Sequence, residues 1–321
     1  MAKTTCAGAS ARALEPSRAK RFLLTVRRES PYLVMMAIPM LYFFIFRYWP
    51  MFGLSIAFQN YRLGAPFISA DADWVGLKWF VQLVKGPFFF RLLRNTVALS
   101  LLNLAISFPI SILMALMLNE IRNRRVRKLT ANVSLLPHFI STAVIVGVLV
   151  NFFSVDDGLV NQIIARAGGT KINFMNSNDW FRTMYIGSGV WQSAGFSAVV
   201  FTAAISGIDP NLYEAAALDG STRVKNIFHI TLPCILPTII IMFILRIGSL
   251  MSVGYEKIIL MYSPSIYETA DTLATYSYRA GILDGKTSLA TAIGLFNSVV
   301  NLILIVGANR LSRRVSETSL W

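Results

Sequence analysis

The chain has 321 residues, of which 55% are apolar and only 14% are charged, and its formal net charge is +14. Soluble domains contain about 25% charged residues, so this composition indicates a membrane protein. The basic residues stand in short runs between apolar stretches, a layout that excludes a single nucleic-acid-binding patch. Two cysteines, Cys6 and Cys234, and two histidines, His138 and His229, are too few to predict a disulfide framework or a metal site.

Six apolar stretches are long enough, or nearly so, to cross a bilayer, which takes about 20 helical residues. Backbone polar groups in hydrocarbon must be satisfied within each segment, so the stretches predict an all-α polytopic membrane protein with six transmembrane helices. In chain order they are Pro31–Phe46, Val97–Leu118, Val133–Phe153, Tyr185–Ile205, Ile235–Met251 and Leu289–Ala308. Because the first and fifth are short, we expect the first to extend through Tyr48 and Trp49 and the fifth through Val253 and Tyr255.

Lys and Arg residues then indicate the orientation, because cytoplasmic loops carry an excess of them. Their distribution favours N- and C-termini in the cytoplasm, and the clearest run is the short loop Arg122–Lys128 after the second stretch. Residues 1–30 are polar and basic and do not have the pattern of a secretory signal. We therefore divide the chain into a cytoplasmic tail (1–30), a first transmembrane helix with an external segment (31–90), a transmembrane core (91–308) and a cytoplasmic tail (309–321).

A short helix is predicted in the second cytoplasmic loop, between the fourth and fifth stretches. Asp209 can cap it, Pro210 suits its first position, and Gly220 suits a left-handed stop. A second short helix should follow from about Arg223 to His229, and we expect Leu232-Pro233 to break the chain before the fifth span.

This loop resembles the EAA loop of ABC importer permeases, whose pattern is Glu-Ala-Ala, three residues, Gly, nine residues and Ile-x-Leu-Pro. The resemblance implies a type I ABC importer permease fold with a cytoplasmic coupling helix that docks into a cleft on an ATPase subunit. Glu214 would offer its carboxylate to a basic group of that ATPase. The coupling residues implied in this way are Glu214, Ala215, Ala216, Asp219, Gly220, Ile230, Leu232 and Pro233. The alternative is an ordinary surface helix between two spans.

Five further segments are similar to polysaccharide- and aldouronate-type permeases, among which alginate-type oligouronate permeases belong. They are Tyr48–Gly53, Ala57–Tyr61, Arg94–Thr96, Thr275–Ile282 and Ala292–Ser298. This resemblance implies an acidic oligosaccharide substrate and a multi-pass location in the bacterial inner (plasma) membrane, surrounded by lipid. The implied partners are a second homologous permease subunit in a heterodimer, two ATPase subunits, and a periplasmic or surface solute-binding protein. The substrate rests on analogy, since no sugar site follows from the residues themselves.

Polar residues inside membrane spans are expensive and usually face a cavity or a partner. Trp191 and Gln192 offer a ring and an amide to a sugar, and Arg246 suits an acidic sugar or a carboxylate elsewhere. The substrate-path candidates are Asn151, Trp191, Gln192, Arg246 and Asn297, and the remaining polar residues in the spans are His138 and Asn301. For each of them the alternative is hydrogen bonding between helices.

Two other classes of protein remain as alternatives. A secondary transporter should show inverted repeats or an intramembrane carboxylate, and no Asp or Glu lies centrally in an expected span. A membrane enzyme should show a nucleophile arrangement or paired carboxylates in a plausible cavity, and neither is seen. Gly285-Lys286-Thr287 looks like the end of a nucleotide-binding loop, but Ala280 stands where that loop needs glycine. We therefore expect a non-catalytic subunit without a cofactor, with Mg-ATP held by the partner ATPases.

Overall fold

The computed structural model describes residues 28–67 and 72–315, and the chain forms two compact units, Met1–Leu54 and Ser55–Trp321. Predictions that fall on residues 1–27 and 316–321, including most of the N-terminal basic tail and Cys6, lie outside the described residues. Throughout the described ranges the regular structure is helical, apart from one isolated β-bridge between Gln59 and Trp74. The all-α expectation is confirmed.

The first apolar segment is one helical run of 29 residues from Ser30 to Phe58. It consists of α2 (Ser30–Phe43), the π-turn η1 (Phe44–Tyr48) and the 3₁₀ segment η2 (Trp49–Phe58). The helix continues through Tyr48 and Trp49, as expected, and also past Pro50, which stands near the start of η2, where a missing N–H costs little. No residue of α2 is buried, and an apolar surface all round is typical of a membrane span.

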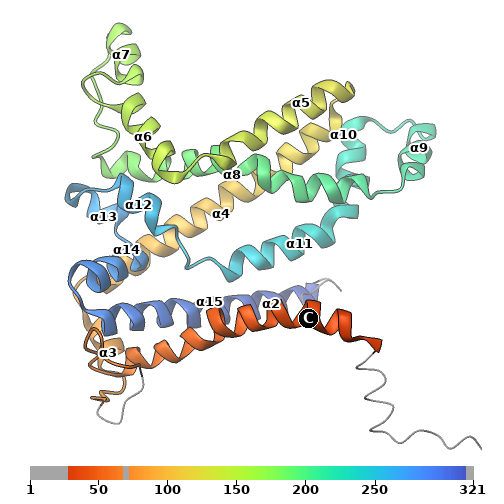
Figure 1. Ribbon diagram of the computed structural model, residues 1–321. Helices are drawn as coiled ribbons and strands as arrows, with labels where there is room; N and C mark the ends of the chain where they lie inside the picture. The colour runs from red at the N-terminus through yellow and green to blue at the C-terminus, as the bar shows by residue number, and fades with distance from the viewer. Residues whose placement is uncertain (1–27, 68–71, 316–321) are drawn as a thin grey trace, which may run out of the picture. The chain divides into compact units, whose positions relative to one another are not determined.

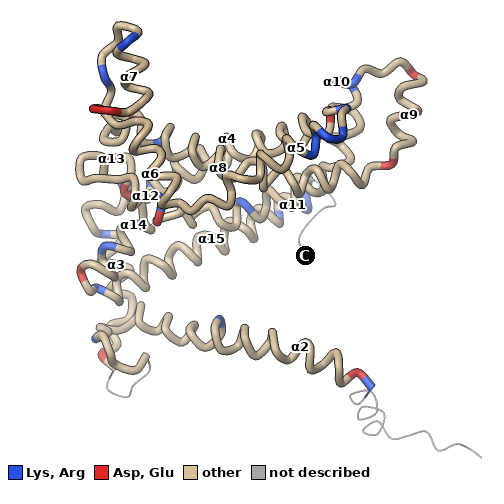
Figure 2. The backbone as a smooth tube through the Cα atoms, turned by 45° about the horizontal axis from the view of Figure 1, so that its top comes forward, with Lys and Arg blue, Asp and Glu red and all other residues tan. Residues whose placement is uncertain are grey.

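Among the described residues of the second unit, four long helices are apolar enough to cross a membrane, and Figure 1 shows them running lengthwise through that unit. They are α4 (Phe89–Glu120), α8 (Asn178–Ser206), the run of α10 (Arg223–Asn226), η4 (Ile227–Thr231) and α11 (Leu232–Gly248), and α15 (Thr287–Val315). α4 packs along α8, and α11 packs along α15. They correspond to the second, fourth, fifth and sixth expected spans, and each begins before its apolar stretch does. Charged residues gather toward the ends of these helices (Figure 2).

The third expected span is a bent pair of helices, so the described residues contain five spans, or six if this pair is one broken span. The chain forms α5 (Arg124–Leu135), η3 (Leu136–Phe139) and α6 (Thr142–Phe153), and its two arms meet at 95°. Pro137 cannot donate a backbone hydrogen bond, and the Ser141 side chain caps the new helix by accepting from the N–H of Val144. The expected loop at residues 122–128 is also mostly helix, because Asn123 caps the first turn of α5.

Two predictions about the fifth span were wrong. Leu232-Pro233 does not break the chain, because α10, η4 and α11 form one helical run of 26 residues. The missing N–H of Pro233 falls where the wider π-turn of η4 joins α11. At its other end α11 stops at Gly248 instead of extending through Val253 and Tyr255. Asn301 of α15 holds the chain there, since its Oδ1 accepts from the N–H of Met251 at 2.9 Å.

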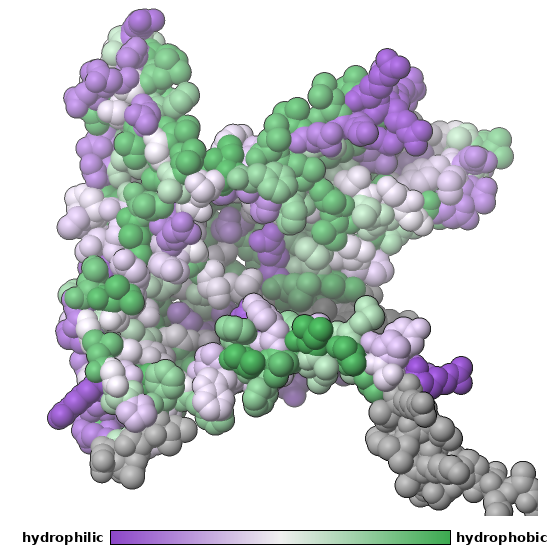
Figure 3. All heavy atoms as spheres, in the orientation of Figure 1, coloured by the Kyte–Doolittle hydropathy of each residue, from purple (hydrophilic) through white to green (hydrophobic). Residues whose placement is uncertain are grey.

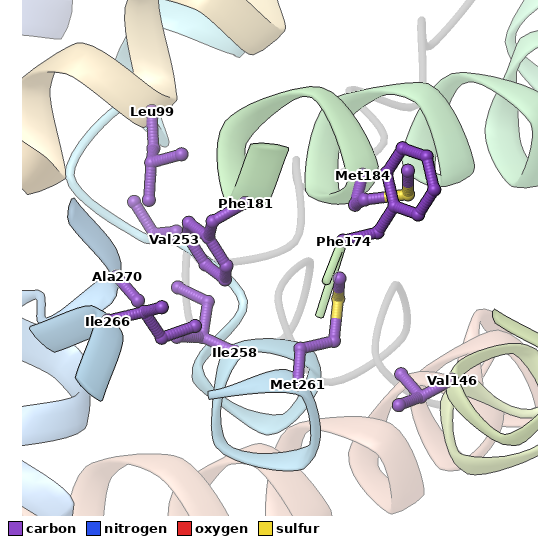
Figure 4. Packing of buried hydrophobic residues seen from close by; sticks show 10 residues of the cluster. All are labelled: Leu99, Val146, Phe174, Phe181, Met184, Val253, Ile258, Met261, Ile266 and Ala270. Carbon is purple, nitrogen blue, oxygen red and sulfur yellow. The ribbon is translucent and has the colours of Figure 1, made fainter. Parts of the chain in front are cut away.

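Short helices connect the long ones. They are α3 (Lys78–Lys85), α7 (Leu159–Arg166), α9 (Pro210–Leu218), α12 (Tyr255–Met261), η5 (Pro264–Ile266), α13 (Tyr267–Ala270), α14 (Leu273–Tyr278) and η6 (Arg279–Leu283). A buried apolar cluster fixes α12 against α8 at the end of the bundle away from α9. In Figure 4, Phe181 of α8 points toward Ile258 of α12, with Val253 and Ile266 beside them. This close packing holds α12 and α8 in fixed positions, and with them the polar side chains that these helices carry.

Candidate coupling segment and polar cavities

Local hydrogen bonds define both ends of α9, as the sequence predicts. At the start, Asp209 Oδ1 accepts from the N–H of Asn211 at 3.0 Å, and Pro210 takes the first helical position. At the end, Gly220 adopts a left-handed conformation with φ of 72°, and the N–H of Ser221 donates to the carbonyl of Ala216 at 2.9 Å. These two features form a Schellman stop, for which a residue with a Cβ is poorly suited at position 220.

Almost the whole of α9 is exposed. None of its nine residues is buried, and the side chain of Leu218 is 90% exposed. Glu214 and the neighbouring Ala215 are exposed, and Glu214 forms no ion pair with any described residue. A helix this short is marginal in water unless its apolar face packs against something. The segment therefore has the properties of a surface that is covered by another protein.

One side chain fastens α9 to the fifth span. The hydroxyl of Tyr213 lies 2.8 Å from Oγ1 of Thr231, which is buried and itself donates to the carbonyl of Asn226. Of the predicted coupling residues around it, Ile230 and Leu232 are half-buried and Pro233 is exposed. The sequence does not indicate a role for Tyr213 and Thr231, because their contact spans 18 residues and depends on the π-turn that places Thr231.

Arg246 stands at the opposite end of α11 and lines a cavity of about 120 Å³. The cavity is polar, with Ser100, Asn103, Ser107 and Ser249 on its walls. Nη2 of Arg246 donates to Oγ of Ser197 at 3.0 Å, and the guanidinium forms no ion pair with any described carboxylate. A guanidinium has five N–H donors, so this single contact leaves most of its hydrogen-bonding capacity for a ligand.

A second, larger space of about 810 Å³ shares the wall residues 252–254 with the first cavity. Asn297 contributes to its wall, and the Oδ1 atom of Asn297 is buried without a hydrogen-bond partner in the described structure. Tyr255 and Tyr278 also line this space, with their rings stacked at 5.9 Å between centroids. Amide groups and aromatic rings are groups that bind sugars. Arg246 and Asn297 therefore line two cavities that share the wall segment 252–254.

The remaining candidates lie elsewhere, along α6 and beside the bend that precedes it. Trp191 lines an apolar pocket. The amide of Gln192 donates to the carbonyl of Ile140 at 3.1 Å and so gives a hydrogen-bond partner to a backbone group at the break between η3 and α6. Asn151 donates to the carbonyl of Gly147 one turn earlier, and His138 stacks on Phe196 at 4.0 Å between ring centroids. The structure therefore does not bring Trp191, Gln192 and Asn151 together with Arg246 and Asn297.

A buried ion pair at the end of the bundle away from α9 was missed by the sequence analysis. Asp271 is fully buried and accepts two hydrogen bonds from Arg279, at 2.8 and 2.7 Å, and one from Thr275 at 2.9 Å. Arg91 of α4 lies 3.6 Å away. Burial lowers the pKa of Arg279, but its hydrogen bonds to Asp271 and Tyr262 outweigh this and raise that pKa above its ordinary value. The pair therefore stays charged and joins α14 and η6 to α4.

Lys257 of α12 is a buried cation without an acidic partner among the described residues. Its Nζ donates to the carbonyl of Tyr185 at 3.0 Å and lies 5.1 Å from the centroid of the Tyr185 ring, which lines the Arg246 cavity. Burial lowers the pKa of Lys257 to about 8, so the side chain is mostly protonated at neutral pH. The region around the Arg246 cavity therefore has an excess of positive charge.

Comparison with known proteins identifies relatives along almost the whole chain. A family described as the binding-protein-dependent transport system inner membrane component matches residues 107–317. The polygalacturonan/rhamnogalacturonan transport system permease protein YteP of Bacillus subtilis is 42% identical and covers 94% of both chains. The protein LplB of the same organism is 40% identical over 92% of both chains. A bacterial alginate ABC transporter, solved with an alginate pentasaccharide-bound periplasmic protein, superposes with a TM-score of 0.85 at 40% identity over 94% of this chain and 100% of the matched chain.

Proposed function

This chain belongs to the family of binding-protein-dependent transport system inner membrane components, and on that premise we propose that it forms half of the import pathway for an acidic oligosaccharide. As a permease subunit it is a non-catalytic membrane component. The observation that carries the proposal is α9, which matches the EAA spacing, is capped as a rigid helix, and exposes Glu214 and Leu218. We assign α9 as the surface that contacts a partner ATPase.

The fifth span connects this surface to the cavity. The helical run Arg223–Gly248 has 26 residues, so it is about 39 Å long. Tyr213 fastens α9 near its start, and Arg246 stands near its end. A displacement of α9 by the ATPases would therefore move the fifth span as a rod and change the walls of the two cavities that share residues 252–254. This is the rigid coupled motion by which a two-state transporter alternates its access.

The positive charge near the cavity supports an acidic substrate. Arg246 has no carboxylate partner among the described residues, and Lys257 is a buried cation close to the cavity wall residue Tyr185. A sugar carboxylate would supply the missing charge, and arginine binds carboxylates in a two-pronged geometry. Two of the named relatives are described as a polygalacturonan/rhamnogalacturonan permease and an alginate transporter, and polygalacturonan and alginate are chains of acidic sugars. Asn297 and the stacked tyrosines would contact the hydroxyls and ring faces of the same chain.

The assembly that we propose contains a second, similar permease subunit in a heterodimer, two ATPase subunits that bind Mg-ATP, and a solute-binding protein at the external end. It lies in the bacterial inner membrane. Both termini and α9 would face the cytoplasm, because the tails and the short segment Arg122–Lys128 are rich in Lys and Arg, as cytoplasmic segments of membrane proteins are. The chain itself would hold no cofactor. The coupling residues would be Glu214, Ala215, Ala216, Asp219, Gly220, Ile230, Leu232 and Pro233.

Uptake into proteoliposomes tests this proposal. The reconstituted assembly should import galacturonate or alginate oligosaccharides only with ATP, and Arg246→Gln should reduce that uptake by about tenfold or more. The reason is that a hydrogen bond to a charged group contributes about 1.5–3 kcal/mol, and 1.4 kcal/mol is a factor of ten. Uptake of a neutral oligosaccharide of equal length should change little. Ser197→Ala is the matched control, because it removes the contact of Arg246 but keeps the charge.

Two results would contradict the proposal. Equal losses for acidic and neutral oligosaccharides in Arg246→Gln would show that Arg246 supports the fold and does not select the substrate. Uptake that continues without ATP but follows an ion gradient would instead favour a secondary transporter.

A further inference from the structure

A groove of about 810 Å³ lies between α5 and α8 at the α9 end of the bundle. Its walls come from the end of α4 at Leu118, from α5, and from the part of α8 that runs from Gly195 to Ser206. α5 and α8 touch at Gly195, where a Cβ would lie only 2.0 Å from the carbonyl oxygen of Ser134. The groove therefore begins where the two backbones meet and continues toward the end of α8, four residues before α9.

Four cationic side chains line this groove, and none forms an ion pair with a described carboxylate. Arg127 is also half-buried, so its charge is only partly hydrated. The acidic residue nearest in sequence, Glu120, lies 3.9 Å from Arg223, and no Asp or Glu follows it before Asp156. The cations are Arg124, Arg125, Arg127 and Lys128. Figure 3 shows hydrophilic surface gathered over this end of α5 and the adjacent α10.

The floor of the groove is apolar and offers little to a polar ligand. Val199 and Ala203 of α8 are exposed there. The two hydroxyls in the groove already donate within their own helix, Thr202 to the carbonyl of Ala198 and Ser206 to the carbonyl of Thr202, each at 2.9 Å. A soluble anion would find the cations but would leave this apolar floor open to water. An occupant that combines an anionic group with a hydrocarbon chain would match both the cations and the apolar floor.

We propose that this groove is a binding site for an anionic phospholipid. The phosphate lies among the four cations, and an acyl chain lies along Val199 and Ala203 toward Gly195. Basic pockets between membrane-spanning helices on the cytoplasmic side have the chemistry that recognises such head groups. The α9 end is the side to which the arginine distribution also assigns the cytoplasm. The lipid supplies the counter-charge that α5 lacks and fills the space between α5 and α8 below their contact at Gly195.

Native mass spectrometry of the purified full chain in detergent tests the charges. Phosphatidylglycerol is titrated, with phosphatidylcholine of the same acyl chains as the neutral lipid. The triple variant R124Q/R125Q/R127Q should bind phosphatidylglycerol about 100-fold more weakly, since each basic residue near a membrane surface contributes about fivefold. Its weak binding of phosphatidylcholine should not change. The matched control R310Q/R313Q/R314Q removes three charges from α15 at the same end of the bundle.

A second variant tests the apolar floor. Ala203→Phe places a ring on an exposed position in the groove and leaves every charge in place. It should weaken phosphatidylglycerol binding by at least tenfold and should not change the binding of inorganic phosphate.

Three outcomes would overturn the proposal. If the two arginine triple variants weaken phosphatidylglycerol binding equally, the lipid is attracted to the basic end of the bundle in general and not to this groove. Displacement of the lipid by millimolar inorganic phosphate would assign a free-anion site. Loss of the lipid from the complete transporter would assign the groove to a protein partner.

Discussion

Replacing Glu214 with lysine is expected to abolish ATP-driven uptake and to release the ATPase subunits from the purified assembly. Glu214 is exposed on α9 without an ion-pair partner among the described residues, so its carboxylate is free for a basic group on the ATPase. Losing a charged hydrogen bond costs about 1.5–3 kcal/mol, or roughly 10- to 150-fold in affinity, and charge reversal adds repulsion. Co-purification with the ATPase and substrate-stimulated ATP hydrolysis measure the effect.

Two control variants separate this effect from misfolding and from net charge. Glu214→Gln removes the charge without reversing it, so its loss of ATPase affinity should be smaller. Glu256→Lys makes the same charge change at an exposed position on α12, at the other end of the bundle, and should leave the assembly intact. If the Glu214→Lys assembly stays intact with normal stimulated hydrolysis, the assigned role of Glu214 is wrong.

Replacing Asp271 with alanine is expected to destabilise the fold more than any surface substitution considered above. The change leaves Arg279 without its counter-ion in a buried site, which Arg91 also approaches. Breaking a buried ion pair from one side costs about 3–5 kcal/mol, because an uncompensated charge remains. The free energy of unfolding of the purified protein measures this loss, and the packing of α14 and η6 on α4 should be lost first.

Asp284→Ala is the matched control for Asp271. Asp284 lies 3.7 Å from Lys286, but both side chains of this pair are more than half exposed. Exposed pairs contribute about 0–1 kcal/mol, so this variant should unfold almost like the parent protein. Equal losses of unfolding free energy in the two variants would mean that the Asp271–Arg279 pair does not join these elements.

Features that depend on residues close together in the chain are predicted well from the sequence. The ends of α9 depend on Asp209, Pro210 and Gly220, all within the segment that they define, and the structure has the expected caps. The long apolar runs likewise predict α4, α8 and α15, because burial in lipid follows from composition alone.

The predictions fail for features that depend on contacts between residues far apart in the sequence. The bend after α5 was hidden because residues 142–153 continue the apolar run, and the broken helix depends on Gln192 of α8 to satisfy the carbonyl of Ile140. In the sequence Asp271 looks like an ordinary acidic residue, because Arg91 lies 180 positions earlier and comes close to it only in the folded chain. The substrate-path candidates were chosen by polarity, which does not distinguish an amide that braces two helices, such as Gln192, from one that faces a cavity, such as Asn297.

The most direct test of the central claim is photo-crosslinking from α9. A photoreactive phenylalanine analogue at Leu218, the 90% exposed residue at the end of the helix, should crosslink to the ATPase subunit in intact membranes. The same analogue at Ile282, which is 70% exposed at the end of the bundle away from α9, should give no ATPase crosslink. Crosslinks from Leu218 to lipid alone, or to a protein at the external face, would contradict the assignment of α9 as the coupling surface.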